Sequence, residues 1–407
     1  KISRITNGYK EARVIFDRYI ENSLKDKTRA KRATSADTLK IFDIHSDMKL
    51  ANISIKDLLS SSKTKSQLAK YFGEALLVAF AGSEQKMVVV EGTHATCNIP
   101  YVISDHISHH QHEEADTLIP LHVKDIIESH NGAHIDVWSP DTDVLLLLMH
   151  LVSVDNIRLP NKVNMITGKG QHRRSINIVD RVIAIGSKKS KGLLGLHNFS
   201  GADWGGKWVG ISKKTWIDSY LALDDNDPVV DQFINLGFLT EQDLTINGNN
   251  VSQCIELFEK FICNTYDKRG ATTLPALRWD LFRTRNLEGE KLPPRRASLI
   301  PHLQRANFTT MRDKSYTSAI PNMPDLNGNG WCVDTDGSIT PTPCMNLPAP
   351  SAILELVKCS CKKGCTHLCG CKKHRLACTA LCKCFSSGCS NFRDYSIAED
   401  EDDDEDI

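Results

Sequence analysis

The sequence predicts an α/β protein in which helices flank a mostly parallel sheet, followed by a helical region and a small cysteine-rich module. Short apolar runs alternate with amphipathic segments over roughly the first 200 residues, a pattern that favours a parallel sheet. From about residue 224 the apolar spacing becomes helical. Nine of the 14 cysteines then fall within residues 359–389. The order is therefore sheet domain, helical extension, cysteine module.

Four apolar runs predict the strands. Residues 12–16 are rich in β-branched and aromatic side chains, residues 86–90 read KMVVV, and residues 135–139 and 162–167 are similar short runs. Residues 67–81 instead carry apolar side chains three and four positions apart, which predicts a helix. Further helices are expected at residues 144–152, 176–185, 192–197, 228–236, 241–246, 251–266, 274–284 and 295–306.

Four acidic side chains mark residues 112–152. Glu114 and Asp116 stand where a helix begins, and Asp141 and Asp143 follow a predicted strand. Because the carboxyl ends of parallel strands meet at one edge of a sheet, we expect these carboxylates to converge. No neighbouring Arg or Lys is expected to neutralise them, and like charges repel strongly. A divalent metal ion is the usual resolution.

Two more carboxylates extend this pattern. Asp17 directly follows the first strand, and Asp203 lies in a glycine-containing turn at residues 199–204. Carboxylate oxygens suit Mg²⁺ or Mn²⁺, and two ions about 3.5–4 Å apart support phosphodiester hydrolysis. Each residue taken alone has another interpretation, because an acidic side chain at a helix start also serves as a cap. As a set they predict a two-metal site.

Basic residues follow the first strand. Lys25, Arg29 and Arg32 belong to a run whose spacing places several positive charges on one face of a helix. Such a face binds phosphates or acts as a nuclear-import signal, and a solvated helix face is the plain alternative. His106, His109, His110 and His112 suggest zinc, but we interpret them as ordinary loop histidines.

The order of these motifs resembles the flap endonuclease and XPG-type 5′-nuclease family of the PIN-like superfamily. The matches are V-I-F-D at 14–17 with the basic run after it, E-A-D at 114–116, S-P-D-T-D at 139–143, and S-G-A-D at 200–203 followed by V-G-I-S-K-K at 209–214. The resemblance covers roughly residues 10–222. It implies a PIN-like sheet and a nuclease whose catalytic, metal-binding carboxylates are Asp17, Glu114, Asp116, Asp141, Asp143 and Asp203.

The resemblance also implies DNA contacts, and the sequence departs from the family's pattern in two places. Lys25, Arg29 and Arg32 would hold the substrate, together with Lys213 and Lys214. The family's domain opens with a strand that carries a further metal-binding Asp, and no residue upstream of Asp17 supplies it. We therefore expect the N-terminus of the domain to be truncated. Serine and lysine at 212 and 213 also replace an expected glycine and proline.

The cysteine module predicts a zinc cluster. Its members are Cys359, Cys361, Cys365, Cys369, Cys371, Cys378, Cys382, Cys384 and Cys389. Without a visible secretory signal, such crowding favours metal ligands over disulfides, and the odd count points the same way. Three tetrahedral Zn²⁺ ions need twelve ligand contacts, which nine thiolates supply if three of them bridge. The spacing resembles the CXC domain of tesmin-type chromatin proteins.

Basic residues within the module suggest a nucleic-acid contact. They are Lys362, Lys363, Lys372, Lys373 and Arg375. Lysine and arginine at such positions contact phosphates and make binding depend on salt. A structural or protein-binding zinc module is the alternative.

Together these motifs predict five regions: a PIN-like nuclease domain at 1–222, a helical extension at 223–310, an irregular linker at 311–350, a CXC zinc domain at 351–393 and an acidic disordered tail at 394–407. Eight of the 50 acidic residues form the run 399–406, so the rest of the chain is net basic. That tail either solubilises the protein or mimics nucleic acid. The longest apolar run, residues 144–152, is too short to span a bilayer.

The predicted function is a nuclear, Mg²⁺- or Mn²⁺-dependent nuclease. It would hydrolyse phosphodiester bonds of DNA, including structured or flapped DNA, with a three-zinc module that docks on DNA. RNA remains open as a substrate, as does a chromatin or mobile-element assembly. The alternative is a catalytically inactive DNA- or chromatin-binding protein that keeps the nuclease fold, or a mobile-element-derived protein.

Overall fold

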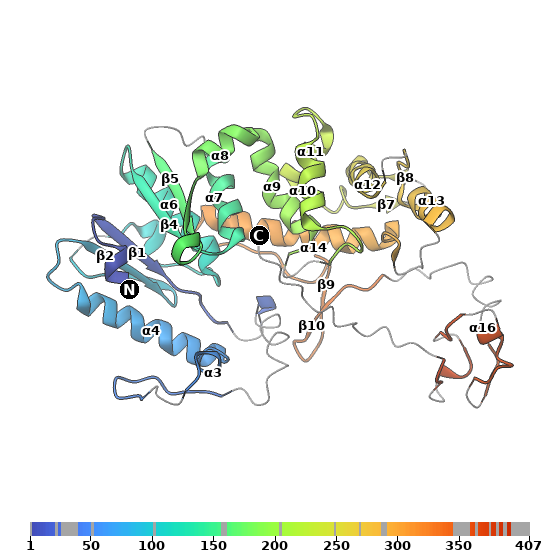
Figure 1. The fold of residues 1–407 in the computed structure, drawn as a ribbon, viewed down its shortest axis with the longest axis horizontal. Coiled ribbons are helices and arrows are strands. Elements are labelled where there is room, and N and C mark those ends of the chain that lie inside the picture. The colour runs from blue at the N-terminus through green and yellow to red at the C-terminus, as the bar shows by residue number, and fades with distance from the viewer. Residues whose placement is uncertain are drawn as a thin grey trace. The chain divides into compact units, whose positions relative to one another are not determined.

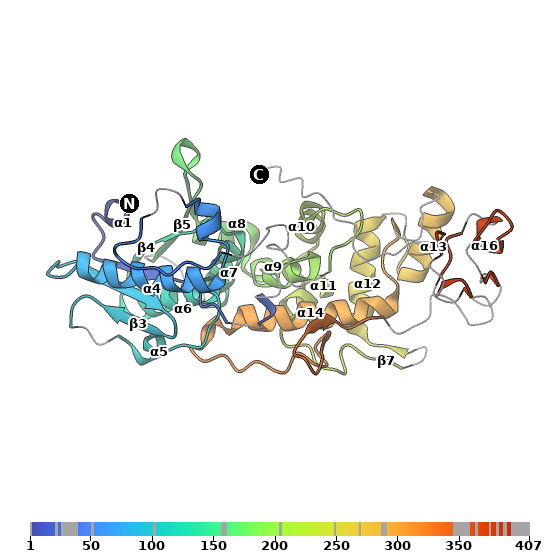
Figure 2. The same cartoon turned by 90° about the horizontal axis from the view of Figure 1, so that it is seen from below.

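The first sheet has three strands (Figure 1). β1 (Glu11–Ile15) pairs in parallel with β2 (Lys86–Glu91), and β2 pairs antiparallel with β3 (His94–Cys97). Met87, Val88, Val89 and Val90 of the KMVVV run are all buried, so the continuous apolar stretch marks a strand covered on both faces. The helix α4 (Ser62–Ala79) contacts β2, and Figure 2 shows it alongside the sheet.

The second sheet also has three strands. β4 (His134–Trp138) pairs in parallel with β5 (Lys162–Thr167), and β5 pairs antiparallel with β6 (Arg174–Asn177). The mixed α/β class is thus confirmed. The described residues form two mixed sheets, however, and not the single, mostly parallel sheet that the sequence led us to expect.

The computed structural model describes residues 2–20, 23–25, 40–49, 53–100, 103–155, 161–202, 206–247, 250–267, 270–285, 291–344, 359–362, 365–373, 376–379, 382–385 and 389–391. The chain divides into two compact units, Lys1–Pro343 and Cys344–Ile407. In the described part of the chain, no helix has the length and apolar character needed to cross a membrane.

The remaining elements of the first unit are mostly helices. Its other helices are α1 (Ile2–Ile5), α3 (Ile55–Leu58), α5 (Asp105–Ser108), α6 (Ala115–Ser129), α7 (Thr142–Val154), α8 (Ile178–Ile185), α9 (Ser187–Ser200), α10 (Lys213–Leu221), α11 (Pro228–Asn235), α12 (Gln253–Tyr266), α13 (Leu274–Arg285) and α14 (Arg296–Lys314). Two 3-10 turns lie at Gly170–His172 and Ser315–Thr317. One small hairpin pairs β7 (Ile246–Asn247) with β8 (Asn250–Val251). Another pairs β9 (Trp331–Val333) with β10 (Ile339–Pro341).

The largest core lies among the central helices. α7 is apolar over most of its surface, and its side chains from Leu147 to Val152 are buried. α9 contacts α7, α11 and α14, and Figures 1 and 2 show α14 as a long helix running along this group. Phe199 and Phe233 are fully buried, and burying one such side chain contributes roughly 1.5–3 kcal/mol. These contacts fix the elements that carry the site.

Two expectations about the later chain need comment. The helix predicted at residues 241–246 is wrong, because Thr240 donates its backbone N–H to the Asp243 carboxylate at 2.8 Å and the segment turns before β7. Such local side-chain bonds compete with helix formation. Within the span expected to be an irregular linker, residues 311–314 complete α14 and a hairpin follows. There Trp331 packs with Leu24 and Phe308.

Candidate metal centres

The carboxylates of the first unit gather where β1 and β4 end and where α6 and α7 begin. Asp17 accepts a hydrogen bond from the backbone N–H of Ala115 at 2.9 Å, which ties the end of β1 to the first turn of α6. Asp141 caps α7 by accepting from the backbone N–H of Asp143 at 2.9 Å. Capping therefore accounts for Asp17 and Asp141, and leaves Asp143 and Asp116 free of that role.

Asp116 lies at the electrostatic centre of this group. Burial, together with the negative charges of Asp141, Glu114 and Asp17, raises the pKa of Asp116 from 3.8 to about 7. A shift of this size requires several carboxylates close to a buried one. The expected convergence of Asp17, Glu114, Asp116 and Asp141 is thus visible in the electrostatics of the fold.

Basic side chains neutralise part of the cluster, which corrects our expectation that none would. Glu114 is buried, and its carboxylate contacts Lys25 Nζ at 3.0 Å and Arg312 Nη1 at 3.0 Å. Arg312 also contacts Asp313 at 2.6 Å, and Asp313 accepts from Asn198 at 2.7 Å. The guanidinium is therefore held in place by the side chains of α9 and α14.

A second basic group faces Asp143. His197 Nε2 lies 3.0 Å from the Asp143 carboxylate, and Lys213 Nζ lies 3.3 Å from the same histidine nitrogen. Burial raises the pKa of Asp143, but the hydrogen bond from His197 and the charges of His197, Lys213 and Lys25 outweigh it, so the pKa is lowered. The surroundings thus favour the ionised form of Asp143 and the protonated form of Asp116.

These side chains enclose a small cavity of about 10 Å³. Glu114, Asp116, Asp143, His197 and Arg312 are among its lining residues. The volume is close to what one water molecule needs. Among the described residues, however, only cysteines form groups of three or more ligand atoms within 4.8 Å of one another. The described carboxylates therefore line a cavity, but their oxygen atoms are not close enough together to form a complete set of metal ligands.

Several candidate residues lie outside the described part of the chain. They are Asp203, Arg29, Arg32, Lys363 and Arg375. Lys214 is described, and its amino group contacts Asp218 at 2.6 Å on an exposed face of α10. Lys213 instead points toward His197 and donates to the Gly201 carbonyl at 2.9 Å. Of these two neighbouring lysines, only Lys213 belongs to the carboxylate site.

The sequence analysis missed Arg312 and His197. Arg312 lies almost 200 positions from Glu114 along the chain, in a span expected to be linker, so no local pattern links the two. His197 stands in an apolar helix three residues before the S-G-A-D motif. The one sequence signal for His197 is that a polar residue ends the apolar run at 192–197, shortly before the candidate metal ligand Asp203.

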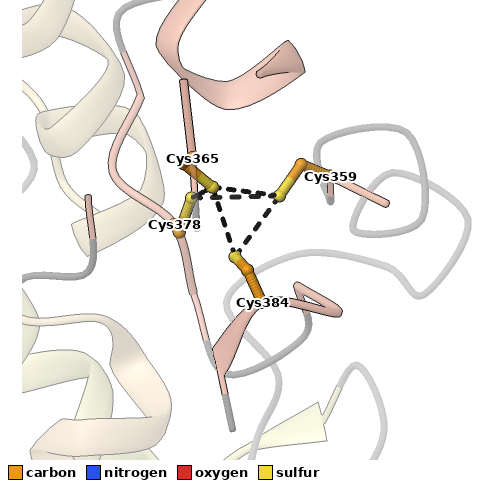
Figure 3. A group of neighbouring side chains, drawn as sticks. All are labelled: Cys359, Cys365, Cys378 and Cys384. Carbon is orange, nitrogen blue, oxygen red and sulfur yellow. Dashed lines mark hydrogen bonds between the residues drawn. The ribbon is translucent and has the colours of Figure 1, made fainter. Parts of the chain in front are cut away.

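The second unit contains a compact cysteine cluster, drawn in part in Figure 3. Cys359, Cys365, Cys378 and Cys384 are buried, and five of their Sγ···Sγ distances lie between 3.4 and 3.9 Å. Four thiolates around one tetrahedral Zn²⁺ stand about 3.8 Å apart. The four sulfur atoms in Figure 3 point toward a common centre, as zinc ligands do.

Two further groups overlap with this one. Cys359, Cys369, Cys371 and Cys378 form the second, and Cys359, Cys361, Cys365 and Cys369 form the third. Cys359 belongs to all three groups, and Cys365, Cys369 and Cys378 each belong to two. Shared thiols are what a polynuclear cluster requires, because separate sites would not share them. The cysteine cluster is therefore compatible with zinc binding.

Backbone N–H groups assist the thiols of this cluster. Cys359 and Thr379 donate to the sulfur of Cys382 at 3.5 and 3.4 Å. Burial raises the pKa of Cys382, but these two donors outweigh it and bring the pKa to about 7. Since the thiolate is the form that binds metal, these bonds favour ligation. Lys362, Lys372 and Lys373 are exposed around the cluster.

Comparison of the chain with protein-family models, with curated proteins and with solved structures finds no match in any of the three. The likeness to nucleases and to CXC domains therefore depends on the sequence motifs alone.

Proposed function

We propose that the first unit is a PIN-like nuclease domain that hydrolyses DNA with two divalent cations. The single observation that carries this proposal is that Glu114, Asp116 and Asp143 line one small cavity, with Asp17 and Asp141 close enough to raise the pKa of Asp116. Lys25, Arg312 and His197 offset part of this negative charge, and a divalent cation would offset the rest. The oxygen-only donor set suits Mg²⁺ or Mn²⁺.

Each residue has a part in this proposal. Asp17, Glu114, Asp116, Asp141, Asp143 and Asp203 would hold the ions, which supply an activated water and stabilise the leaving oxygen of a phosphodiester. Lys25 and Arg312 hold Glu114 in place, and His197 holds Asp143. Lys25 and Lys213 lie beside the carboxylates and would contact substrate phosphates in addition to their present partners, and Arg29 and Arg32 would extend that surface.

The second unit, in the same proposal, is a three-zinc CXC module that docks the nuclease on DNA. Nine thiolates hold three Zn²⁺ ions if three of them bridge, and Cys359, Cys365, Cys369 and Cys378 are the shared thiols from which the bridges would come. The exposed Lys362, Lys372 and Lys373 would contact phosphates. DNA as the substrate makes the nucleus the expected compartment.

The nuclease assay tests the first unit. The full chain is incubated with Mn²⁺ and with flap, hairpin and single-stranded DNA or RNA. We expect Asp141→Asn/Asp143→Asn to lose at least 100-fold in rate, since both carboxylates would face the ions. The matched control, Asp43→Asn/Asp47→Asn, removes two exposed carboxylates and should cut at the wild-type rate. Equal cleavage by wild type and Asp141→Asn/Asp143→Asn would overturn the proposal.

A second candidate function is favoured by the ion pairs themselves. Lys25 and Arg312 already neutralise Glu114, and His197 is paired with Asp143. A nuclease-like scaffold that binds DNA or chromatin without cutting it would keep such pairs permanently. This candidate, which includes a protein derived from a mobile element, predicts DNA binding without hydrolysis in the same assay.

A further inference from the structure

Two histidines from separate segments meet on the surface of the first unit. His94 belongs to β3, and His109 follows the short helix α5. Their Nδ1 atoms lie 3.2 Å apart, and the ring centroids are 4.8 Å apart in an edge-to-face arrangement. Both side chains are exposed, so a solute reaches them directly. The sequence places them 15 residues apart and gives no reason to pair them.

The backbone holds this pair in place. An isolated antiparallel bridge joins His94 to His109, and the backbone N–H of His110 donates to the Thr93 carbonyl at 2.9 Å. The two imidazoles are thus presented by paired backbone segments and not by two independent loops. Positioning of this kind lowers the entropy cost of binding an ion between them.

The distance suits a metal ion. Zn²⁺ binds imidazole nitrogen at about 2.0–2.1 Å in tetrahedral geometry, which separates two such nitrogens by roughly 3.3 Å. A direct hydrogen bond between the rings is the alternative, and it requires one Nδ1 to carry the proton. His94 Nδ1 also lies 2.9 Å from the Thr93 hydroxyl, and an ion bound at that nitrogen would replace this contact.

A neighbouring histidine is buried beside this segment. His110 is 1 % exposed, and neither of its ring nitrogens has a hydrogen-bond partner in the described part of the chain. A buried polar group without a partner costs about 1–3 kcal/mol. The segment that carries His109 therefore also carries an imidazole whose nitrogens are unsatisfied among the described residues.

We propose that His94 and His109 form an open two-histidine site for a divalent transition metal, with Zn²⁺ as the best-suited ion. No third Asp, Glu, Cys or His among the described residues brings a ligand atom within 4.8 Å of both. Two protein ligands are one fewer than the three of a catalytic zinc site, so water or a further ligand would complete the coordination. His109 also lines a groove of about 490 Å³ whose walls include Asp125 and Glu128.

Zinc titration of the full chain tests this site. The protein is first loaded with zinc so that the cysteine cluster is filled, then titrated with ZnSO₄ by calorimetry. Wild type should bind one additional ion per chain. His94→Ala and His109→Ala should each weaken that binding at least tenfold, whereas the exposed His130→Ala should match wild type. Pulsed EPR with Cu²⁺ as the probe should detect two imidazoles in wild type and one in either variant.

Three outcomes overturn the proposal. In the first, wild type binds no additional ion. In the second, both variants bind the additional ion as tightly as wild type does. Either result would mean that the two rings are only hydrogen-bonded to each other. Alternatively, Asp141→Asn/Asp143→Asn abolishes the additional binding while His94→Ala retains it, which assigns the ion to the carboxylates. The site does not depend on nuclease activity, so a negative cleavage assay leaves this test unaffected.

Discussion

Among the clustered carboxylates, Asp116 is the one whose ionisation is made most unfavourable by burial and by its negative neighbours. Its pKa rises from 3.8 to about 7 on folding because it is buried among other carboxylates. Folding thus favours its protonated form. The associated stability is fully present below pH 3.8 and is lost as the pH rises through about 7. Without a divalent cation, the folded protein is strained at this residue at neutral pH.

Asp116→Asn should therefore stabilise the protein at neutral pH in the absence of Mg²⁺ and Mn²⁺. The amide cannot ionise, so the cost of a buried charge disappears. We expect a gain on the order of 1–3 kcal/mol at pH 8 and almost none at pH 4. Thermal melts across this pH range measure it, with the exposed Asp47→Asn as the control. A gain that is equal at pH 4 and pH 8 would contradict the electrostatic account.

Arg312 offsets two acidic side chains at once. Its guanidinium contacts Glu114 at 3.0 Å and Asp313 at 2.6 Å, and Asp313 also accepts a hydrogen bond from the amide of Asn198 at 2.7 Å. Removing the cation would leave both carboxylates undercompensated in a poorly solvated place. Such a change is usually more costly than the pair itself contributes.

Arg312→Ala is accordingly expected to destabilise the first unit by about 3 kcal/mol. Arg283→Ala removes one partner of an exposed pair, Arg283 with Asp280 at 3.7 Å, and should cost less than about 1 kcal/mol. Urea unfolding of the two variants measures the difference. If both variants unfold alike, the network around Arg312 contributes little to stability.

At the scale of elements, α9 positions His197 through its close packing on α11. A methyl group at Gly195 would lie 2.2 Å from the backbone carbonyl oxygen of Phe233 and 3.1 Å from Leu236. A contact of that kind forces one helix away from the other, since a backbone oxygen cannot rotate aside. The glycine thus sets the distance at which α9 presents His197 to Asp143.

Gly195→Ala should cost about 2–4 kcal/mol and loosen the contact of His197 with Asp143. Gly73→Ala is a helical control, because its methyl group would meet only a side-chain methyl of Val89 at 3.0 Å. Thermal melts give the stability, and the NMR titration of His197 reports the contact. A His197 titration unchanged in Gly195→Ala would show that α9 does not depend on this glycine.

The elements also show what the sequence can predict. Strands at 86–90 and 162–167 and the helix at 67–81 agree with β2, β5 and α4, because buried faces leave periodic patterns. The clustering of Asp17, Glu114, Asp116 and Asp141 was predicted from their places at strand ends and at a helix start. β3 was missed because its four residues, H-A-T-C, include no large apolar side chain that would mark a strand.

Other features depended on contacts that no local pattern records. Glu114 meets Arg312, 198 positions away, and His94 meets His109, 15 positions away, only after the chain has folded. The single parallel sheet failed as a prediction for a related reason. Strand pairing depends on which edges meet, and β3 and β6 turn back antiparallel to their neighbours.

At the scale of the whole molecule, the two units should respond differently to loss of metal. The cysteine cluster is the whole of the core identified in the second unit, so its folding free energy should come from zinc. The first unit has an extended apolar core of its own. Chelation should unfold one unit and leave the other folded.

Hydrogen exchange measured with and without a zinc chelator tests this separation. Amides at residues 359–391 should lose protection on chelation, while those of α7 and α9 should keep it. Added Zn²⁺ should restore the protection, and added Mg²⁺ should not, since thiolates are soft ligands. Simultaneous loss of protection in both units would contradict independent folding of the two cores.

The central claim is that the carboxylates of the first unit hold divalent cations. Anomalous diffraction from crystals of the full chain soaked in Mn²⁺ tests it most directly. The account predicts two manganese peaks about 3.5–4 Å apart among Asp17, Glu114, Asp116, Asp141 and Asp143. The absence of any peak there, with Lys25 and Arg312 still bound to Glu114, would contradict it.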